Sequence, residues 1–287
     1  SYGTESDTNA LYTANVIANK SIEINGKTVD ASKLSPEFLS GTLQEAGGIE
    51  ANVATGYHAI EFLLWGQDLH GTGPGAGERP YTDYDLANCT GGNCDRRAEY
   101  LKSASDLLVS DLQEMVNNWK QDGAARKHLL DGEPKTGISA ILTGMGSLSY
   151  GELAGQRMKL GLMLHDPEEE HDCFSDNTYI SHLYDAIGIR NAYHASYKRL
   201  DGSTVAGPSV ADLVKATDPA LDAELSAKLD TSVDKMKAIE ARALAGEAYD
   251  QQIAEGNTEG NATVQAAIDA LLDQTKSIER AVAALKL

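Results

Sequence analysis

Positive charge is scarce in this sequence. Its 287 residues include 24 lysines and arginines against 43 aspartates and glutamates, which gives a formal net charge of −19. Proteins that bind nucleic acid neutralise phosphates with clusters of Lys and Arg, and no basic stripe of that kind occurs here. The composition therefore excludes nucleic acid as a partner and disfavours an anionic membrane surface.

Long apolar runs and aromatic residues are also rare. The longest stretch without a charged residue, 136–151, is rich in glycine and is shorter than the roughly 18 to 20 apolar residues that a membrane-spanning helix needs. Aromatic residues make up 6% of the chain, which is low for a β-sandwich and suits a helical protein rich in Ala and Leu. The sequence therefore predicts a globular, mainly helical chain without a transmembrane segment.

Only three cysteines are present. Cys89 and Cys94 bracket a short loop in which Gly91 and Gly92 supply the freedom that a small disulfide ring needs. We favour a disulfide over a pair of reduced thiols, and also over a zinc site, because no second Cys or His pair stands at zinc-finger spacing. A disulfide would place the protein outside the cytosol.

Apolar residues recur at helical spacing through much of the chain. The pattern predicts helices over residues 101–119, 138–164, 219–244 and 264–285, and Asp218 is in position to cap the third of them. Glycines recur within 138–164. We take them to mean that another element packs close to that helix and that the helix is broken there.

Strand signals are confined to one place. Residues 21–24 and 27–30 alternate in polarity around Asn25-Gly26, a pair typical of a type I′ turn. This pattern predicts a β-hairpin that decorates a helical protein. The segment 66–94 is rich in Gly, Pro and Asp, and a loop of that length is usually functional or a lid.

One apolar helical segment also carries groups that can bind a metal ion. His58 and Glu61 are three residues apart, and at about 100° per residue they lie on one helical face. Glu50 falls on the same face if the helix is continuous back to it. An imidazole with one or two carboxylates suits iron or another divalent cation. The spacing equally suits a core histidine that is hydrogen-bonded to Glu61, and the residues alone leave both interpretations open.

Two aromatic residues flank this pair at helical spacing. We expect Tyr57 and Trp65 to be core aromatics, with the lining of a cleft as the alternative.

Several stretches resemble the imelysin family, which includes the insulin-cleaving membrane protease and the iron-regulated protein A type. Residues 56–61, Gly-Tyr-His-Ala-Ile-Glu, resemble its Gly-x-His-x-x-Glu signature. The resemblance covers essentially the whole chain and is greatest to the iron-regulated protein A branch. Further similar stretches are 89–97, 144–158 and 169–178.

The resemblance implies an all-α fold of two four-helix-bundle-like halves, with the signature near their junction and a small β-hairpin as decoration. We assign residues 1–122 to part of the first bundle and 123–287 to the second. Family members carry further helices upstream, so we expect those of the first bundle to come from a separate segment or from another envelope protein. The resemblance also implies a bacterial periplasmic or lipid-anchored envelope protein that is linked to iron.

Other candidate residues lie in the second half. Glu152 and Arg157 stand about as far from His58 and Glu61 as a duplicated half would place them, and a buried salt bridge between the bundles explains them equally well. Ser175 and Asp176 follow the acidic run 168–170, which is typical of a solvated helix end. Either could cap a helix that runs through Tyr179 and Ile187 and that ends or kinks at Gly188.

Three functions remain open at this stage. A usual zinc peptidase helix carries His-Glu-x-x-His, whereas this chain has no second histidine at i+4 from His58. We therefore favour binding of a metal ion, iron or zinc, or of a small ligand that carries one, with His58, Glu61 and Glu50 as candidate ligands. The alternatives are a metallopeptidase that uses His58 and Glu61, and a structural protein that binds a partner.

Overall fold

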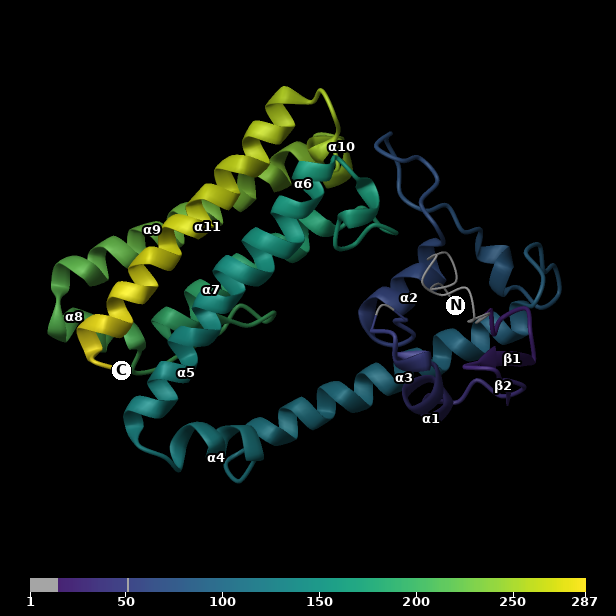
Figure 1. Ribbon diagram of the computed structural model, residues 1–287, viewed down its shortest axis with the longest axis horizontal. Helices are drawn as coiled ribbons and strands as arrows, with labels where there is room; N and C mark the ends of the chain where they lie inside the picture. Colours follow the sequence, from purple (N-terminus) through teal and green to yellow (C-terminus); the bar gives the residue numbers. More distant parts are fainter. Residues whose placement is uncertain (1–14, 51) are drawn as a thin grey trace. The chain divides into compact units, whose positions relative to one another are not determined.

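The computed structural model describes residues 15–50 and 52–287, and most of them are helical (Figure 1). Contacts along the chain divide it into two compact units. Unit 1 comprises the chain up to Asp68 together with Gly77–Lys120, and unit 2 comprises Leu69–Ala76 together with Gln121–Leu287. Among the described residues, no helix combines the length and the apolar character that crossing a bilayer requires.

The predicted hairpin lies near the start of the described part of unit 1. Strands β1 (Ser21–Ile24) and β2 (Lys27–Asp30) pair antiparallel, with Ser21 opposite Asp30 and Ile24 opposite Lys27. The turn residues Asn25 and Gly26 both have positive φ, 51° and 71°, as a type I′ turn demands. The sequence prediction of this hairpin is therefore confirmed in both position and register.

Short helices lead from the hairpin to two longer ones, and their apolar faces form the core of unit 1. Buried residues of the hairpin, of the short helices, of α2 and of the first part of α3 contact one another there. Beyond Leu108, in contrast, the apolar stripe of α3 is largely exposed, and Met115 is 55% exposed. The helices of unit 1 are α1 (Pro36–Phe38), η2 (Leu39–Leu43), η3 (Ala46–Gly48), α2 (Gly56–Trp65), η4 (Tyr81–Tyr84) and α3 (Cys94–Trp119).

Unit 2 is a helical bundle. Helix α9 packs against α7 and α11, and α11 also packs against η5, so that these helices lie side by side (Figure 1). Two buried apolar clusters run along the bundle. Its helices are α4 (Ala124–Leu130), α5 (Pro134–Ser147), η5 (Leu148–Lys159), α6 (Leu160–Leu164), η6 (Pro167–Glu169), α7 (Thr178–His194), α8 (Val210–Thr217), α9 (Pro219–Leu244), α10 (Tyr249–Ile253) and α11 (Thr258–Leu285).

Side-chain caps define where the last two long helices begin. The Asp218 carboxylate accepts hydrogen bonds from the backbone N–H groups of Ala220 and Leu221, and Pro219 occupies the first turn of α9. Asn257 caps α11 by accepting from the backbone N–H of Gly260. The predicted start of α9 and the predicted helix over 264–285 are therefore confirmed.

The glycine-rich segment 138–164 differs in part from expectation. It stays helical, but Leu148–Lys159 is a π-helix between α5 and α6, so the predicted irregularity is present. The expectation that another element packs close to the glycines is confirmed at Gly161, where an added Cβ would lie 3.3 Å from Ile253 Cδ1. It is wrong at Gly144 and Gly151, where an added Cβ would meet nothing within 4 Å.

Helix α7 begins and ends elsewhere than predicted. Asn177 occupies the N-cap position, whereas Asp176 has a left-handed backbone with φ of 54° and is not a cap. The helix also continues through Gly188 to His194, because its buried face, including Ile189 and Tyr193, packs in the bundle core. Tertiary packing thus overrides the weak helix propensity of this glycine.

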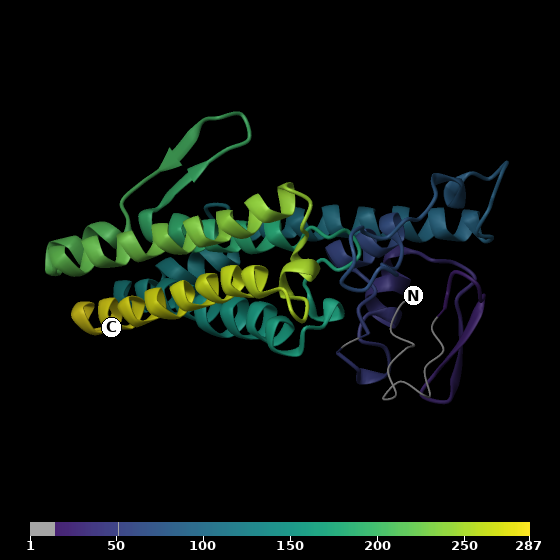
Figure 2. The ribbon, with the colours of Figure 1, turned by 90° about the horizontal axis from the view of Figure 1, so that it is seen from above.

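Unit 2 carries a second hairpin that the sequence pattern does not predict. Strands β3 (Ser196–Lys198) and β4 (Thr204–Ala206) pair antiparallel and project from the helices of unit 2 (Figure 2). Each strand has only three residues and most of them are exposed, so no alternation of buried and exposed positions marks it in the sequence.

Candidate functional site

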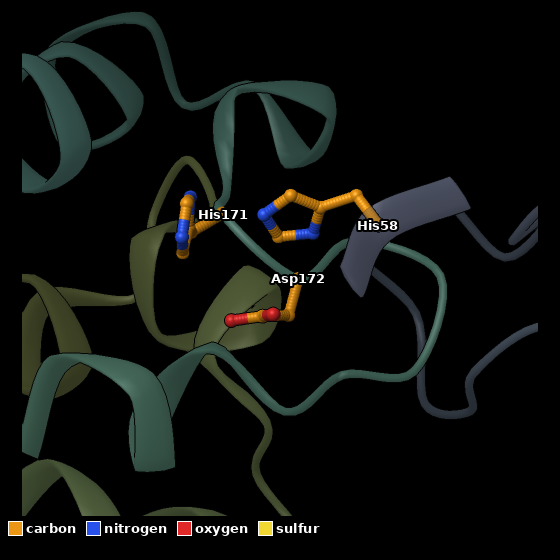
Figure 3. Close-up of side chains that lie close together, drawn as sticks. All are labelled: His58, His171 and Asp172. Atoms are coloured by element: carbon orange, nitrogen blue, oxygen red, sulfur yellow. The ribbon is translucent and has the colours of Figure 1, made fainter. Parts of the chain in front are cut away.

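Helix α2 presents His58 and Glu61 side by side. Nδ1 of His58 lies 3.0 Å from Oε2 of Glu61, which is a hydrogen bond across one turn of the helix. The His58 side chain, seen on its helix in Figure 3, is 32% exposed, and that of Glu61 is 9% exposed. The pair therefore shares one face, and it combines a reachable imidazole with a nearly buried carboxylate.

The backbone at the start of α2 requires glycine. Gly56 has φ of 82°, and an added Cβ would meet nothing within 4 Å, so conformation and not space selects this residue. Gln44 fixes the segment just before it, because its Oε1 accepts from the N–H of Ala54 and from the hydroxyl of Thr55, at 2.9 and 3.0 Å. Tyr100 of α3 donates to the carbonyl of Ala54. These bonds set the position from which His58 projects.

Arg79 closes the other end of α2. Its backbone N–H donates to the carbonyl of Trp65, and its guanidinium donates to the carbonyl of Phe62, at 2.8 and 3.3 Å. The guanidinium also lies over the Phe62 ring, 5.5 Å from its centre. A cation at this end is favourable because the last carbonyls of a helix carry partial negative charge.

A buried network holds the loop that carries Arg79. Asp83, 7% exposed, forms an ion pair with Arg79 at 3.3 Å and accepts from the Thr90 hydroxyl. Arg97 of α3 donates to the carbonyl of Asp83 at 2.8 Å. The hydroxyl of Tyr84 donates to the carbonyl of Leu63 in α2, and burial raises the pKa of Tyr84 although Arg79 and Arg97 act in the opposite direction. The loop over 77–94 is thus a rigid support for α2.

Cys89 and Cys94 form a disulfide that closes this loop onto the start of α3. Their Cα atoms are 5.9 Å apart, within the usual range. Asn93, between them, has a left-handed backbone with φ of 51°. The bond ties the support of α2 directly to α3.

We expect this disulfide to be present in the isolated protein. Intact mass measured after alkylation should show one modified thiol, Cys173, in unreduced protein and three after reduction, because the two other cysteines are bonded. Alkylation at Cys89 and Cys94 without reduction would contradict this expectation.

Three further residues near the signature lie differently from expectation. Helix α2 begins at Gly56, so it is not continuous back to Glu50, which is exposed outside it. The geometric condition for Glu50 as a ligand on the same helical face is therefore not met. Tyr57 is 64% exposed and Trp65 is 41% exposed, so the expectation that they are core aromatics is wrong. Their positions on α2 face away from the buried side that holds Ala59 and Leu63.

Glu152 and Arg157 form an ion pair within η5, with 3.7 Å between the charged atoms. Both side chains are partly exposed and both belong to unit 2, so the alternative of a buried salt bridge between bundles is wrong. Arg157 also contacts His171, with its guanidinium 2.9 Å from Nε2. His171 and Asp172 are neighbours on the loop that precedes α7 (Figure 3).

Asp176, which the sequence analysis considered as a helix cap, belongs to an acidic group instead. One carboxylate oxygen each from Asp176, Glu170 and Asp250 lies within 4.8 Å of the other two. The acidic run 168–170 predicts a solvated position for Glu170, and no pattern marks Asp250, yet their side chains are buried, with 5% and 1% exposed. Ser175 is half-buried on the same loop and is not a member of this group. No spacing signal connects residues so far apart in the sequence.

The bond between His58 and Glu61 has a consequence for ligand chemistry. When the carboxylate is ionised and the imidazole is neutral, this bond requires the proton on Nδ1 and the lone pair on Nε2, because an ionised carboxylate only accepts hydrogen bonds. Histidines that bind metals are commonly oriented by a carboxylate in this way, and the carboxylate raises their basicity. The chemistry of this pair therefore fits a metal ion.

Comparisons with known proteins identify the family and the fold of this chain. The sequence model named "Peptidase_M75: Imelysin" matches residues 7–278. A comparison with curated proteins finds no match. Among solved structures, the chain is similar to a crystal structure named as a "putative iron-regulated protein A precursor" from Parabacteroides distasonis, with a TM-score of 0.66 and 19% identity over 97% of this chain and 72% of the other. At this identity the structural match establishes the fold.

Proposed function

Because the chain belongs to the imelysin family, we propose that it binds a metal ion, or a small ligand that carries one, with His58 as a metal ligand and Glu61 as its orienting partner. The observation that carries the proposal is the 3.0 Å bond between His58 Nδ1 and Glu61 Oε2 on a helix held at both ends. A nearly buried carboxylate costs several kcal/mol unless its charge is compensated. A bound cation would supply further compensation.

The donor set favours iron or zinc. An imidazole nitrogen is a good ligand for both, whereas calcium and magnesium prefer oxygen alone. One histidine leaves most coordination positions to other donors, which suits a metal that arrives as part of a small chelate. Bound there, the metal would be cargo or would supply Lewis acidity, while His58 and Glu61 hold it in place.

We further propose that the protein works in iron acquisition in the bacterial envelope. The disulfide Cys89–Cys94 supports an oxidising compartment such as the periplasm. The name of the similar protein from Parabacteroides distasonis supports a link to iron. The net charge of −19 suits a protein that attracts cations.

Titration calorimetry tests the site assignment. Wild-type protein, freed of metal, would be titrated with Zn²⁺, with Fe²⁺ under anaerobic conditions and with ferric citrate, in buffer that contains excess Ca²⁺. We expect His58→Gln to abolish measurable binding of at least one of these, and Glu61→Gln to weaken it about 10- to 100-fold, as for other groups that orient metal ligands. Stability should stay within about 1 to 2 kcal/mol of wild type.

An exposed histidine provides the matched control. His128 lies in α4, and His128→Gln removes an imidazole by the same change without touching α2. It should bind as wild type does. Unchanged affinity in His58→Gln for all three metal forms would overturn the assignment.

A metallopeptidase is the second candidate, because the family carries a peptidase name. The geometry favours binding, since α2 has one histidine and Glu61 is engaged with it. A peptidase of the usual zinc type places two histidines on one helix and leaves the glutamate to act on water. Metal-dependent cleavage of an unfolded protein substrate that is lost in Glu61→Gln would favour the peptidase. A protein that only binds a structural partner would show neither metal binding nor cleavage.

A further inference from the structure

Unit 2 gathers three carboxylates from segments far apart in the chain. Glu170 follows η6, Asp176 stands on the loop before α7, and Asp250 lies in the short helix α10. An oxygen of each lies within 4.8 Å of the other two, and both Glu170 and Asp250 are nearly fully buried. Helix α10 packs against η6, which holds the two segments together.

The neighbouring carboxylates act on Glu170 with charges of the same sign. Burial raises the pKa of Glu170 well above its usual value, and the charges of Asp250, Asp176 and Asp172 raise it further, while a hydrogen bond with Thr178 acts in the opposite direction. Repulsion between buried like charges is costly, so such a group either keeps protons or binds a cation.

A buried histidine packs against Tyr249. His182 is fully buried, and burial together with the charges of His171 and Arg157 lowers its pKa to about 3. Its ring meets that of Tyr249 edge to face, with 5.0 Å between the centres. At neutral pH it is therefore an uncharged neighbour of the acidic group.

Buried polar atoms beside the group lack hydrogen-bond partners. Within the described part of the chain, neither Oε2 of Glu170 nor the hydroxyl of Tyr249 has one. Tyr249 is fully buried, and its hydroxyl is close enough to Glu170 for that carboxylate to raise the pKa of the phenol. Buried polar atoms are nearly always satisfied in native proteins, by protein, water or an ion. Two such atoms at one acidic group point to a bound ligand.

We propose that Glu170, Asp176 and Asp250 form a second site in unit 2, which binds a hard divalent cation of the Ca²⁺ type. The group offers oxygen atoms only, the donors that Ca²⁺ prefers, and it contains neither imidazole nor thiol. Two oxygens bound to Ca²⁺ at about 2.3–2.6 Å can stand up to roughly 5 Å apart, so a separation within 4.8 Å is compatible with shared coordination. The site does not depend on the function proposed for His58.

The cation would add a link between two segments that already pack against each other. Helix α10 has five residues, and the side-chain amide of Gln252 positions it by donating to the carbonyls of Ile239 and Glu247. The loop from Glu170 to Asp176 also carries His171, which contacts Arg157. Binding would therefore stabilise both α10 and the loop before α7.

Calcium titration and thermal unfolding test this proposal. We expect the wild-type protein to bind Ca²⁺ and to melt several degrees higher in Ca²⁺ than in EGTA. Asp250→Asn and Glu170→Gln should weaken binding about tenfold or more and remove the shift. In EGTA both variants should melt at or above the wild-type temperature, because each removes one of the repelling charges. If the carboxylates only supported the fold, the variants would not combine a lost Ca²⁺ shift with a melting temperature in EGTA at or above that of wild type.

The neighbouring Glu169 offers a matched control. It is exposed in the same segment, and Glu169→Gln makes the same change in charge. This variant should bind Ca²⁺ and shift in melting temperature as wild type does. If a buried variant fails to fold, as judged by circular dichroism, the half-buried Asp176→Asn replaces it. No Ca²⁺ binding by wild type, or equal binding and shift in the variants, would overturn the proposal, and neither result touches Zn²⁺ or iron binding at His58.

Discussion

Arg96→Met is expected to destabilise unit 1 by about 3 to 5 kcal/mol, the range seen when a buried charged hydrogen-bonding group is removed. Arg96 is 5% exposed in α3, and its guanidinium donates to backbone carbonyls before and after the hairpin. Methionine preserves most of the volume but donates nothing, so the carbonyls lose their partners. They are those of Val16, Ile17, Asn19, Ala31 and Ser32.

Tryptophan fluorescence measures this effect on unit 1 alone. The chain has two tryptophans, Trp65 and Trp119, and both belong to unit 1. Urea unfolding followed at their emission should shift strongly to lower urea in Arg96→Met. Lys102→Met on the same helix is the control, because Lys102 is exposed and its ion pair with Asp106 is of the surface type, worth at most about 1 kcal/mol. Equal shifts in both variants would show that the carbonyl bonds of Arg96 are not the cause.

Gly260→Ala is expected to destabilise unit 2 by about 2 kcal/mol, although alanine is the better helix former by about 1 kcal/mol. An added Cβ would lie 2.6 Å from the Gln252 carbonyl oxygen and 2.7 Å from Gln252 Cα. Both are backbone atoms, so α10 itself must move. That carbonyl also accepts from Asn261, at 2.8 Å, and this bond would be disturbed.

Replacing a glycine that has open space around its Cα is expected to stabilise the protein. Gly188 lies inside α7, and an added Cβ there would meet nothing within 4 Å. Gly188→Ala should therefore stabilise unit 2 by about 0.5 to 1 kcal/mol through helix propensity alone. Calorimetric unfolding measures both variants, with tryptophan emission to identify the transition of unit 1. A change of the same sign in the two would contradict the packing argument.

Local chemistry determined the features that the sequence predicted correctly. The hairpin follows from Asn25-Gly26, whose positive φ angles shape the turn before any distant contact is made. The start of α9 follows from Asp218, which bonds to N–H groups two and three residues ahead. The shared face of His58 and Glu61 follows from helix geometry in the same way. Each depends on residues only a few positions apart.

Tertiary structure decided the rest, since burial and convergence depend on how distant segments pack. Glu170 ends a charged run that is typical of a solvated helix end. It is buried nonetheless, because η6 packs against α10. Tyr57 looks like a core aromatic in the sequence, yet the core of unit 1 lies on another side of α2. No sequence motif identifies the buried role of Arg96, because its partners are backbone carbonyls, which every residue type carries. The sequence by itself thus determined the fold class, the hairpin and the helical face with His58 and Glu61, and only packing created the acidic group of unit 2.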